Sequence, residues 1–501
     1  MNGLILFEDE HLLVINKPSG INTHKPDRFA PDGIHEWLTK RAPRWAKLSI
    51  LHRLDKDTSG VMLFGKTRQA NQSLTQQFES HRIKKQYLLL SSTRPTRSKF
   101  FGKSADASTE FEFVQPHGDL FLTEARPLTG KTHQVRKHAA ENGFPIAGDT
   151  KYGGAPAPRL MLHAHRITFE HPGSGEKMTM EATVPLAFDE VNPFVAAREF
   201  RDLLFDEQTN AFRLISGGAD GIPDVIVDSY AGVLLVQWQN DVVAQESPAF
   251  LEQLQERCRP VAVYEQLVAR SKREQPRPIL STYPAAGRFP IVENGMTYLV
   301  SFGEGLSTGV FLDQRENRRR LLAAKLSGKT VLNCFAYTCA FSVAAAKAGA
   351  VTTSIDLSRN YLEWGKDNFR ANGLDLDKHE FLIGDVFDWL KRLAKRGQTW
   401  DVVILDPPTF STSKKGRPFQ AGRDYEELAA QAMPLVAKGG TLLCSTNMRT
   451  LSPEEFETSV QQAARQTGRV IESMEFETVP FDFRVAEGER PYLKTLWLRL
   501  G

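Results

Sequence analysis

The spacing of apolar residues predicts strands at the start of the chain and a helix soon after them. Residues 3–16 alternate short apolar runs with an acidic turn, which is typical of paired β-strands. Residues 61–64 form a short, continuous apolar run, as expected of a buried strand. Apolar residues then recur at helical spacing between 67 and 80, which predicts a helix there.

The pattern changes twice further along the chain. Residues about 195–295 are mixed: a turn at 220–224 precedes a strand-like run, a helix is expected at 249–258, and no catalytic constellation stands out. From about residue 300, strands are expected at 331–333, 352–356 and 401–405, a short strand ending at Asp385, and helices at 341–349 and 361–372. This alternation predicts a Rossmann-like, doubly wound parallel sheet that binds ligands at the carboxyl ends of its strands.

The length of 501 residues suggests two to four domains at about 100–200 residues each. The stretch from Pro185 to Pro193 indicates the end of the first domain. The expected domains are 1–192, 193–297 and 298–501, with a small α+β domain in the middle. The expected fold class is therefore multidomain α+β and α/β.

Composition indicates a globular protein, with 41% hydrophobic and 25% charged residues. Acidic residues 8–10 cut the first apolar run, so no signal peptide is expected, and no apolar run is long enough to span a bilayer. Cys258, Cys334, Cys339 and Cys444 show neither metal-ligand spacing nor a disulfide framework. We expect a cytoplasmic protein with no metal site and no membrane partner.

Net charge is only +3, so contacts with a nucleic acid must come from local basic clusters. Three clusters stand out, at 81–85, 315–320 and 414–417. A solvated surface is the simpler interpretation of each cluster taken alone.

Residues 52–60, His-Arg-Leu-Asp-Lys-Asp-Thr-Ser-Gly, place the carboxylate of Asp55 where a loop enters the predicted strand 61–64. A salt-bridged surface turn is the ordinary interpretation of such an aspartate. The whole string, however, resembles the central motif of the RluA-type pseudouridine synthases. Further matches at 16–20, 84–87 and 126–138 extend the resemblance over nearly all of residues 3–187.

The resemblance implies a mixed-sheet domain that isomerises uridine to pseudouridine in RNA without a cofactor. By it, Asp55 is the essential carboxylate acting on the ribose, as base or as nucleophile, and Arg136 pairs with it. Tyr87 would pack on the uracil and take the proton from carbon 5, where the alternative is an ordinary sheet tyrosine. Arg53 would fill the space left by the flipped base, and His133, about one turn before Arg136, would contact RNA.

A second group of chemically suggestive residues lies near the C-terminus. Asp356 is expected at the end of the second strand, where an acid can hydrogen-bond a ribose, although the dinucleotide glycine fingerprint is absent. The strand at 401–405 is followed by Asp-Pro-Pro-Thr-Phe at 406–410. Two prolines offer no amide hydrogens, which leaves a carboxylate and carbonyls to face a base and an aromatic ring to stack on it.

These residues resemble class I methyltransferases that use S-adenosylmethionine and modify large-subunit rRNA. Matches at 309–315, 333–338, 358–364, 406–414 and 491–494 spread the resemblance over about residues 205–501. It implies S-adenosylmethionine as cofactor, bound by Asp313, Asn333, Phe335, Tyr337, Thr338, Asp356, Asp385 and Asp406. It also implies a catalytic Asp406, and base or RNA contacts by Pro407, Pro408, Phe410 and Lys414.

Two departures from the family pattern bear on the chemistry. Cys339 stands where the family usually has a glycine in the cofactor turn. Methylation of cytosine at carbon 5 needs a thiolate just after the strand that follows Gly440. Asn447 stands in that position, and Cys444 lies three residues earlier, inside the strand. The pattern therefore favours methylation of a guanine nitrogen, which needs positioning and no covalent nucleophile.

The sequence thus predicts a bifunctional enzyme that forms pseudouridine with its N-terminal half and methylates a base of large-subunit rRNA with its C-terminal half. Two alternatives stay open for the C-terminal half: cytosine carbon-5 methylation through Cys444, and a non-catalytic RNA-binding module. The modified nucleotides and the oligomeric state are not specified by the sequence.

Overall fold

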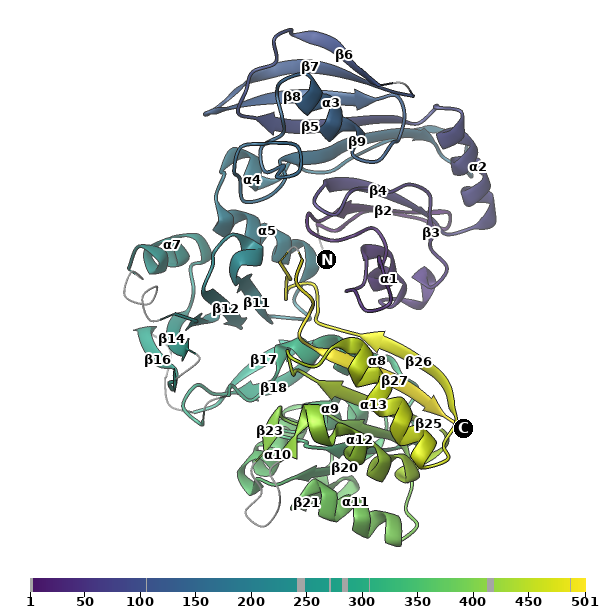
Figure 1. Ribbon diagram of the computed structural model, residues 1–501, viewed down its shortest axis with the longest axis vertical. Coiled ribbons are helices and arrows are strands. Elements are labelled where there is room, and N and C mark those ends of the chain that lie inside the picture. The colour runs from purple at the N-terminus through teal and green to yellow at the C-terminus, as the bar shows by residue number, and fades with distance from the viewer. Residues whose placement is uncertain are drawn as a thin grey trace.

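The computed structural model describes residues 3–104, 106–240, 248–269, 272–281, 287–305, 307–411, 419–486 and 488–501. Three large sheets follow one another along the chain, from the purple N-terminal end to the yellow C-terminal end in Figure 1. They confirm the expected multidomain α+β and α/β fold. Within these residues no helix combines the length and the apolar character needed to cross a membrane.

The N-terminal sheet has ten strands: β1 (Ile5–Glu8), β2 (Leu12–Lys17), β3 (Ser49–Ile50), β4 (Ser59–Gly65), β5 (Lys84–Ser91), β6 (Lys99–Ser104), β7 (Ala107–His117), β8 (Leu120–Pro127), β9 (Leu162–Glu170) and β10 (Lys177–Glu181). Its main order is β1-β2-β4-β9-β5-β8-β7-β6. The sheet is mixed because β4 and β9 are parallel while their other neighbours pair antiparallel. Strands β2 and β4 are buried along their whole length, which explains their continuous apolar runs.

Four helices accompany this sheet: α1 (Ile34–Thr39), α2 (Arg68–Glu79), α3 (Gln134–Glu141) and α4 (Leu186–Asp189). The Thr67 side chain accepts a hydrogen bond from the Ala70 amide at 3.2 Å and so caps α2, which confirms the helix predicted at 67–80. Helix α3 begins only at Gln134, because His133 before it takes a left-handed conformation with φ 55°.

The central sheet contains β11 (Ala211–Ser216), β12 (Val225–Tyr230), β13 (Val233–Trp238), β14 (Ala262–Ala269), β15 (Lys272–Arg273) and β16 (Arg277–Ser281). Helices α5 (Pro193–Leu204) and α7 (Pro248–Cys258) accompany it. Strands β13 and β14 are parallel and α7 lies between them in sequence, so this part is α+β as predicted.

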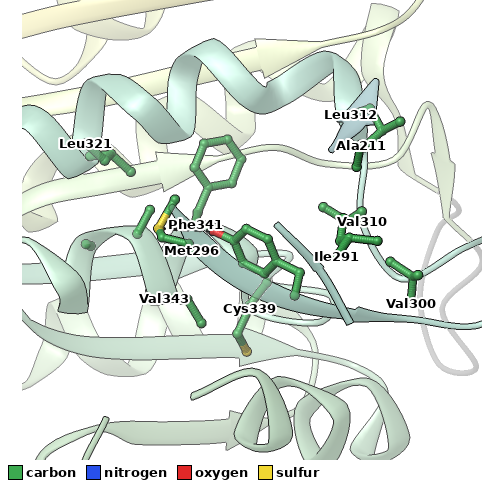
Figure 2. Packing of buried hydrophobic residues seen from close by; sticks show 14 of the residues in the cluster. Ala211, Ile291, Met296, Val300, Val310, Leu312, Leu321, Cys339, Phe341 and Val343 are labelled. Carbon is green, nitrogen blue, oxygen red and sulfur yellow. Dashed lines mark hydrogen bonds between the residues drawn. The ribbon is translucent and has the colours of Figure 1, made fainter. Parts of the chain in front are cut away.

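A separate hairpin, β17 (Phe289–Glu293) and β18 (Met296–Val300), precedes the C-terminal sheet. The expected boundary at 297/298 falls inside β18. The hairpin packs against both neighbouring units: Figure 2 shows Ile291 and Met296 in one buried cluster with Ala211 of the central sheet and with Cys339 and Phe341.

The C-terminal sheet runs in the order β21 (Glu380–Ile383), β20 (Val351–Asp356), β19 (Thr330–Cys334), β22 (Trp400–Leu405), β25 (Val436–Thr446), β27 (Lys494–Leu500), β26 (Ile471–Glu477). The first five strands are parallel and β27 is antiparallel to both of its neighbours. The helices are α8 (Arg315–Ala323), α9 (Ala340–Lys347), α10 (Arg359–Ala371), α11 (Val386–Lys395), α12 (Ala421–Ala432) and α13 (Pro453–Gln466). A short ladder joins β23 (Phe410–Ser411) to β24 (Phe419–Gln420).

This sheet confirms the doubly wound prediction and corrects one detail. Asp385 does not end a strand: β21 stops at Ile383, and the Asp385 carboxylate caps α11 by accepting the Phe387 amide at 2.9 Å. The chain order reverses between β19 and β22, so the carboxyl ends of these two strands form the point where such folds bind ligands.

The N-terminal unit docks on the edge of the C-terminal sheet. Lys25 Nζ donates to the Phe476 carbonyl on strand β26 at 3.1 Å. Lys40 forms an ion pair with Glu477 on the same strand, with 2.7 Å between Nζ and Oε1. Arg41 pairs with Glu316 of α8 at 2.7 Å. The two halves of the chain therefore share an extensive polar interface.

Candidate active sites

The first candidate site is a cavity of about 790 Å³ in the N-terminal unit. Its wall includes Arg53 and Asp55 from the loop before β4, Tyr87 from β5, and His133 and Arg136 from the start of α3. These are the five residues for which the sequence predicted roles in pseudouridine formation. They come from three separate segments of the chain, and the fold places them around the same cavity.

Arg136 connects two carboxylates across this cavity. Its Nη1 lies 3.5 Å from Asp55 Oδ2, while its Nε and Nη2 donate to the buried Asp149 at 2.7 and 2.8 Å. Burial alone would lower the pKa of Arg136, but Asp149 and Asp55 raise it above its ordinary value. The forked bond to Asp149 fixes the guanidinium plane, so one nitrogen stays directed at Asp55.

Asp149 is a partner of Arg136 to which the sequence assigned no role. It lies in a tight turn after Gly148, which has a positive φ of 79°. An aspartate in such a turn is the only local signal, because its pairing with Arg136 depends on the tertiary fold.

Tyr87 is half-buried beside Asp55. Burial, followed by the negative charge of Asp55, raises the pKa of Tyr87 above its ordinary value. The phenol therefore stays protonated at neutral pH and offers a ring face and an O–H to the cavity.

His133 and Arg53 line the same cavity as Asp55. His133 Nε2 is 4.0 Å from Asp55 Oδ2, and its Nδ1 is 3.0 Å from the Tyr152 hydroxyl. Burial lowers the pKa of His133, which favours the neutral ring at pH 7. Arg53 is exposed on the cavity wall, where its charge is available to a phosphate.

The loop that carries Asp55 is held from beneath by residues 17–23. Lys17, fully buried, donates its Nζ to the carbonyls of Lys56, Pro18 and Ile21 at 2.7–3.0 Å. Gly20 N also donates to the Lys56 carbonyl at 2.8 Å. Thr23 Oγ1 exchanges hydrogen bonds with Leu54 N and O. Burial lowers the pKa of Lys17 to about 7. The family match at 16–20 pointed to this segment, but the hydrogen bonds of Lys17 to the Asp55 loop depend on the tertiary fold.

The second candidate site lies at the switch point of the C-terminal sheet, directly after β22. Asp406 Oδ1 accepts from Gln314 Nε2 at 3.1 Å, and Gln314 also donates to Ser445 Oγ at 2.8 Å. Burial, followed by repulsion from Asp313, raises the pKa of Asp406 to about 7. Asp406 therefore holds its proton more tightly than an ordinary aspartate does.

Asp313 lies beside Asp406. Its Oδ2 accepts a hydrogen bond from the Tyr492 hydroxyl at 2.8 Å. Burial raises the pKa of Asp313 despite this bond. Arg213, which pairs with Asp228 at 2.9 Å, brings a positive charge from the central unit toward Asp313. The sequence predicted roles for Asp313 and Asp406, and the family match at 491–494 includes Tyr492, but it did not place Tyr492 beside Asp313, which is 179 positions away in the chain.

The predicted cofactor loop after β19 is conformationally strained. Phe335, Tyr337 and Cys339 all have positive φ, at 58°, 49° and 61°, which costs about 1–2 kcal/mol per residue. Gly309 N donates to the Tyr337 hydroxyl at 2.9 Å, and Thr338 Oγ1 donates to the Gly309 carbonyl. These bonds hold the loop against the segment before α8. Strain of this kind, sustained by the surrounding structure, is characteristic of ligand-binding loops.

Asp356 ends β20 beneath this loop. Its two oxygens accept the amides of Tyr337 and Ser358, each at 2.8 Å. Two large apolar side chains near the ends of β20 and β21 are nonetheless exposed, Leu357 by 56% and Ile383 by 43%. An acid with spare lone pairs between exposed apolar side chains suits a ribose and a planar base, so the residues present fit an adenosyl group.

The side chains of two predicted cofactor residues, Asn333 and Asp385, form hydrogen bonds within the protein. Asn333 is buried under the loop and donates to Ser342 Oγ at 2.9 Å, so its side chain is directed into the core. Asp385 caps α11, as described above. Cys339 is fully buried, and an added Cβ on Gly365 would lie 2.5 Å from its Sγ, so Gly365 provides the space for this cysteine.

The Asp-Pro-Pro loop faces the end of β25. Pro407 is buried and Pro408 exposed, while the Phe410 ring is 64% exposed. Thr409 Oγ1 donates to Asn447 Oδ1 at 2.6 Å, which links the loop to the position where a cytosine methyltransferase needs its cysteine. Lys414 lies outside the described residues.

Cys444 lies in the core of the sheet. It is fully buried, and burial raises the pKa of its thiol to about 12. A thiol of this kind is inert, so the structure argues against Cys444 as the nucleophile of a cytosine methyltransferase. Within the part of the chain that the structure describes, no group of three or more His, Cys, Asp or Glu residues could hold a metal ion.

Comparison with known proteins identifies two enzyme families in this chain. The family described as S-adenosylmethionine-dependent methyltransferase matches residues 213–490, more than half of the chain. The chain belongs to this family. The family described as RNA pseudouridylate synthase matches residues 11–141, which contain Asp55, Tyr87, His133 and Arg136. The protein is therefore an enzyme with a pseudouridine synthase half and a methyltransferase half, and its cofactor is S-adenosylmethionine.

Relatives of known name support the methyltransferase half. Ribosomal RNA large subunit methyltransferase I of Shewanella denitrificans is 34% identical over 72% of this chain and 93% of its own length. The protein of the same name from Escherichia coli is 33% identical over 64% of this chain and 80% of its own length. The solved structure of SMU.776, described as a methyltransferase in complex with SAH, has a TM-score of 0.56 and 27% identity, and the match covers 66% of this chain and 87% of that one.

Proposed function

We propose that this enzyme modifies large-subunit rRNA twice, isomerising a uridine to pseudouridine and methylating a guanine nitrogen. The observation that carries the proposal is that one chain holds two separate acid-centred sites, at Asp55 and at Asp406. The N-terminal family match and the names of the relatives support RNA as the substrate. The same proposal predicts a cytoplasmic protein.

At the first site, pseudouridine formation breaks the bond between uracil N1 and ribose C1′ and forms one between uracil C5 and C1′. The proton on C5 is lost and N1 gains one, so no cofactor is needed. In the proposal, Asp55 acts on the ribose as base or nucleophile, and Arg136, 3.5 Å away, positions it. The target base leaves the helix stack at a cost of a few kcal/mol, and Arg53 fills the space that it leaves.

Tyr87 packs on the uracil in this proposal. Because its phenol is protonated at neutral pH, it takes the C5 proton only if its own proton moves on. His133 is neutral and contacts the RNA near Asp55 as a hydrogen-bonding group.

At the second site, Asp356, Phe335, Tyr337 and Thr338 would hold S-adenosylmethionine, which supplies the methyl group when bound. Asp313 supports this site through its effect on Asp406. The side chains of Asn333 and Asp385 would act indirectly, by fixing the strand end and the start of α11.

The methyl acceptor would lie against the Asp-Pro-Pro loop. An ionised Asp406 accepts a hydrogen bond from a guanine N–H and so orients the neighbouring ring nitrogen. Pro407 and Pro408 shape the loop, and the exposed Phe410 ring stacks on the base. Guanine is favoured over cytosine C5 because Asn447, not a cysteine, faces this loop and Cys444 is buried. We also propose RNA contacts for Lys414.

The domain proposal follows the packing. We propose units at 1–192, 193–297 and 298–501, with the β17–β18 hairpin at the second boundary, where Ile291, Met296 and Val300 share one buried cluster with residues of both neighbouring units.

Separate inactivation of the two sites tests the proposal. Purified Asp55→Asn, Asp406→Asn and Cys444→Ala variants would be incubated with large-subunit rRNA fragments and S-adenosylmethionine, and the nucleosides analysed by mass spectrometry. We expect Asp55→Asn to lose pseudouridine alone, Asp406→Asn to lose methylguanosine alone, and Cys444→Ala to keep both. A methylated cytosine that depends on Cys444 would refute the guanine assignment. Calorimetry that detects no S-adenosylmethionine binding would favour a non-catalytic C-terminal module.

A further inference from the structure

One segment of the C-terminal half reaches the catalytic loop of the N-terminal half. Residues 478–493 connect β26 to β27, and in Figure 1 this yellow loop extends from the C-terminal sheet toward the chain end marked N. Thr478 Oγ1 donates to the Leu493 carbonyl at its base. The loop therefore begins and ends at the same edge of its sheet. Its tip lies between the N-terminal and the central units.

The tip is held in place by a buried set of charges. The fully buried Asp482 accepts from Arg315 Nη1 at 3.1 Å and from the Arg213 amide at 2.9 Å. Its carbonyl accepts from Arg201 Nη2 at 2.9 Å. These partners belong to α8, to β11 and to α5, so Asp482 joins the central and C-terminal units around the loop.

Arg484, two residues further on, contacts both the central and the N-terminal unit. Its Nη1 donates to Asp220 at 3.0 Å, and its guanidinium lies 5.2 Å from the Phe200 ring centroid. The guanidinium also lies against Gly20: a Cβ added there would be 2.5 Å from Arg484 Nη2. Gly20 has φ 87°, so both the backbone conformation and the contact require a glycine.

Gly20 belongs to the segment that supports Asp55. Its amide donates to the carbonyl of Lys56, the residue after Asp55, at 2.8 Å. Ser19 Oγ, next to it, donates to the Asp57 carbonyl at 2.7 Å. A shift of this turn would therefore move the backbone on the C-terminal side of Asp55. Catalytic rates are sensitive to such shifts, since a misplacement of about 1 Å can cost about 100-fold.

From this geometry we propose that Arg484 of the methyltransferase half is a positioning residue for Asp55, so that pseudouridine formation requires the C-terminal half in its docked place. The inference rests on the proposed role of Asp55. Arg484 touches no substrate in this proposal. It acts by packing against the turn at 17–20 and restricting the movement of that turn.

The test compares Arg484→Ala with Arg484→Lys and with a matched control, in the full-length protein. Arg490→Ala removes an exposed arginine of the same loop that pairs only with the exposed Glu454 among the described residues. Single-turnover and steady-state rates of pseudouridine formation on an rRNA fragment would be measured, with S-adenosylmethionine binding and thermal unfolding as independent readouts. Asp220 keeps its forked bond to Arg201 in each variant, which preserves the fold around it.

We expect Arg484→Ala to lower kcat about tenfold with little change in KM, because positioning acts on the transition state. Arg484→Lys, which keeps a cation for Asp220, should recover part of the loss, and Arg490→Ala should match wild type. S-adenosylmethionine binding should be the same in all of them. An Arg484→Ala enzyme with wild-type kcat would overturn the inference, as would a parallel loss of both activities with a lower Tm.

A second comparison isolates the contact itself. Gly20→Ala introduces backbone strain in any background, but its collision with the guanidinium exists only when Arg484 is present. Gly20→Ala should therefore cost more activity in the wild type than in the Arg484→Ala background, and equal costs would contradict the contact. If the wild type forms no pseudouridine, or Asp55→Asn still forms it, the proposed function itself fails, which is a separate outcome.

Discussion

The two candidate active sites place an aspartate in opposite electrostatic settings. Asp55 faces the Arg136 guanidinium at 3.5 Å on the wall of a large cavity. Asp406 is next to a second carboxylate, Asp313, and burial and that repulsion raise its pKa to about 7. The first arrangement suits a carboxylate that attacks or deprotonates a sugar, and the second suits one that recognises and orients a base.

The sites also differ in what determines their shape. Side chains from three segments converge around Asp55, and hydrogen bonds from residues 17–23 hold its loop. Around Asp406 the backbone dominates, with Phe335, Tyr337 and Cys339 all at positive φ. Changes of charge should therefore be most damaging in the N-terminal site, and changes of backbone or volume in the C-terminal one.

The largest effect is expected from Asp55→Asn. Removal of the reacting carboxylate should lower pseudouridine formation about 10³-fold or more, within the range lost with a catalytic acid or base. Methylation should not change. Asp57→Asn, which alters an exposed carboxylate two residues away, is the matched control and should retain most activity. Tritium release from uridine labelled at C5 measures the reaction, and activity of Asp55→Asn equal to that of Asp57→Asn would contradict the assignment.

Asp149→Asn is expected to have the next largest effect. It removes the negative charge and one of the two acceptor oxygens that bind Arg136, so the forked bond is lost and the guanidinium is less well oriented toward Asp55. Weakening the bonds to this partly buried guanidinium should cost about 1–3 kcal/mol of stability. Pseudouridine formation should fall while S-adenosylmethionine binding persists. Chemical denaturation and the same tritium assay would show this, and a variant with normal activity would exclude the supporting role of Asp149.

The raised pKa of Asp406 predicts a dependence of stability on pH. The folded-state value of about 7 is above the ordinary value of 3.8, so the folded protein binds this proton more tightly. The stabilisation is present below about pH 4 and is lost as pH rises to about 7. Relative to Asp406→Asn, the wild type should lose a few kcal/mol over this range, at about 1.4 kcal/mol per unit. Denaturation of both proteins at several pH values would measure this loss. If the free energy of unfolding changes with pH in the same way in both, the raised pKa of Asp406 is contradicted.

A smaller effect is expected at the cofactor loop. Gly365→Ala places a Cβ 2.5 Å from Cys339 Sγ, and overpacking of this kind costs about 1–3 kcal/mol. Affinity for S-adenosylmethionine should fall because the loop moves. Cys339→Gly in the same chain removes the colliding side chain and should restore part of the affinity. Calorimetry would measure both, and a Cys339→Gly change that gives no recovery would disprove the coupling.

Cys444→Ala should have the smallest effect. The methylation rate should stay at the wild-type level, because the thiol is buried and protonated. Loss of the buried sulfur should cost only about 1 kcal/mol of stability. Thermal unfolding and methyl-transfer assays would measure the two, and loss of methylation in a folded Cys444→Ala protein would revive the cytosine alternative.

The sequence predicted the features that depend on local pattern. Apolar spacing identified α2, β4 and the strand–helix alternation of the C-terminal sheet. The apolar patterns of helices and of buried strands can each be recognised within a short stretch of sequence. The resemblance of short motifs to known families was enough to group Asp55, Tyr87 and Arg136 in one site. The family matches confirm the two enzyme types, while the roles of the individual residues stay predictions.

Features that depend on long-range packing could not be predicted. Asp149 is the principal partner of Arg136, Tyr492 bonds Asp313 from the far end of the chain, and Arg484 meets Gly20 across two units. None of these pairs has a periodicity or spacing that marks it. The prediction that Asp385 ends a strand was wrong because a capping aspartate and a strand-ending aspartate look alike in sequence.

The central claim is that the chain performs two independent reactions on one RNA. Its most direct test is mass spectrometry of rRNA nucleosides from cells that lack the protein, complemented with wild type, Asp55→Asn or Asp406→Asn. The account predicts that one pseudouridine and one methylguanosine are lost together in the deletion, and that each variant restores only the modification made by its intact site. Restoration of pseudouridine by Asp55→Asn, or a deletion strain with unchanged rRNA modification, would contradict it.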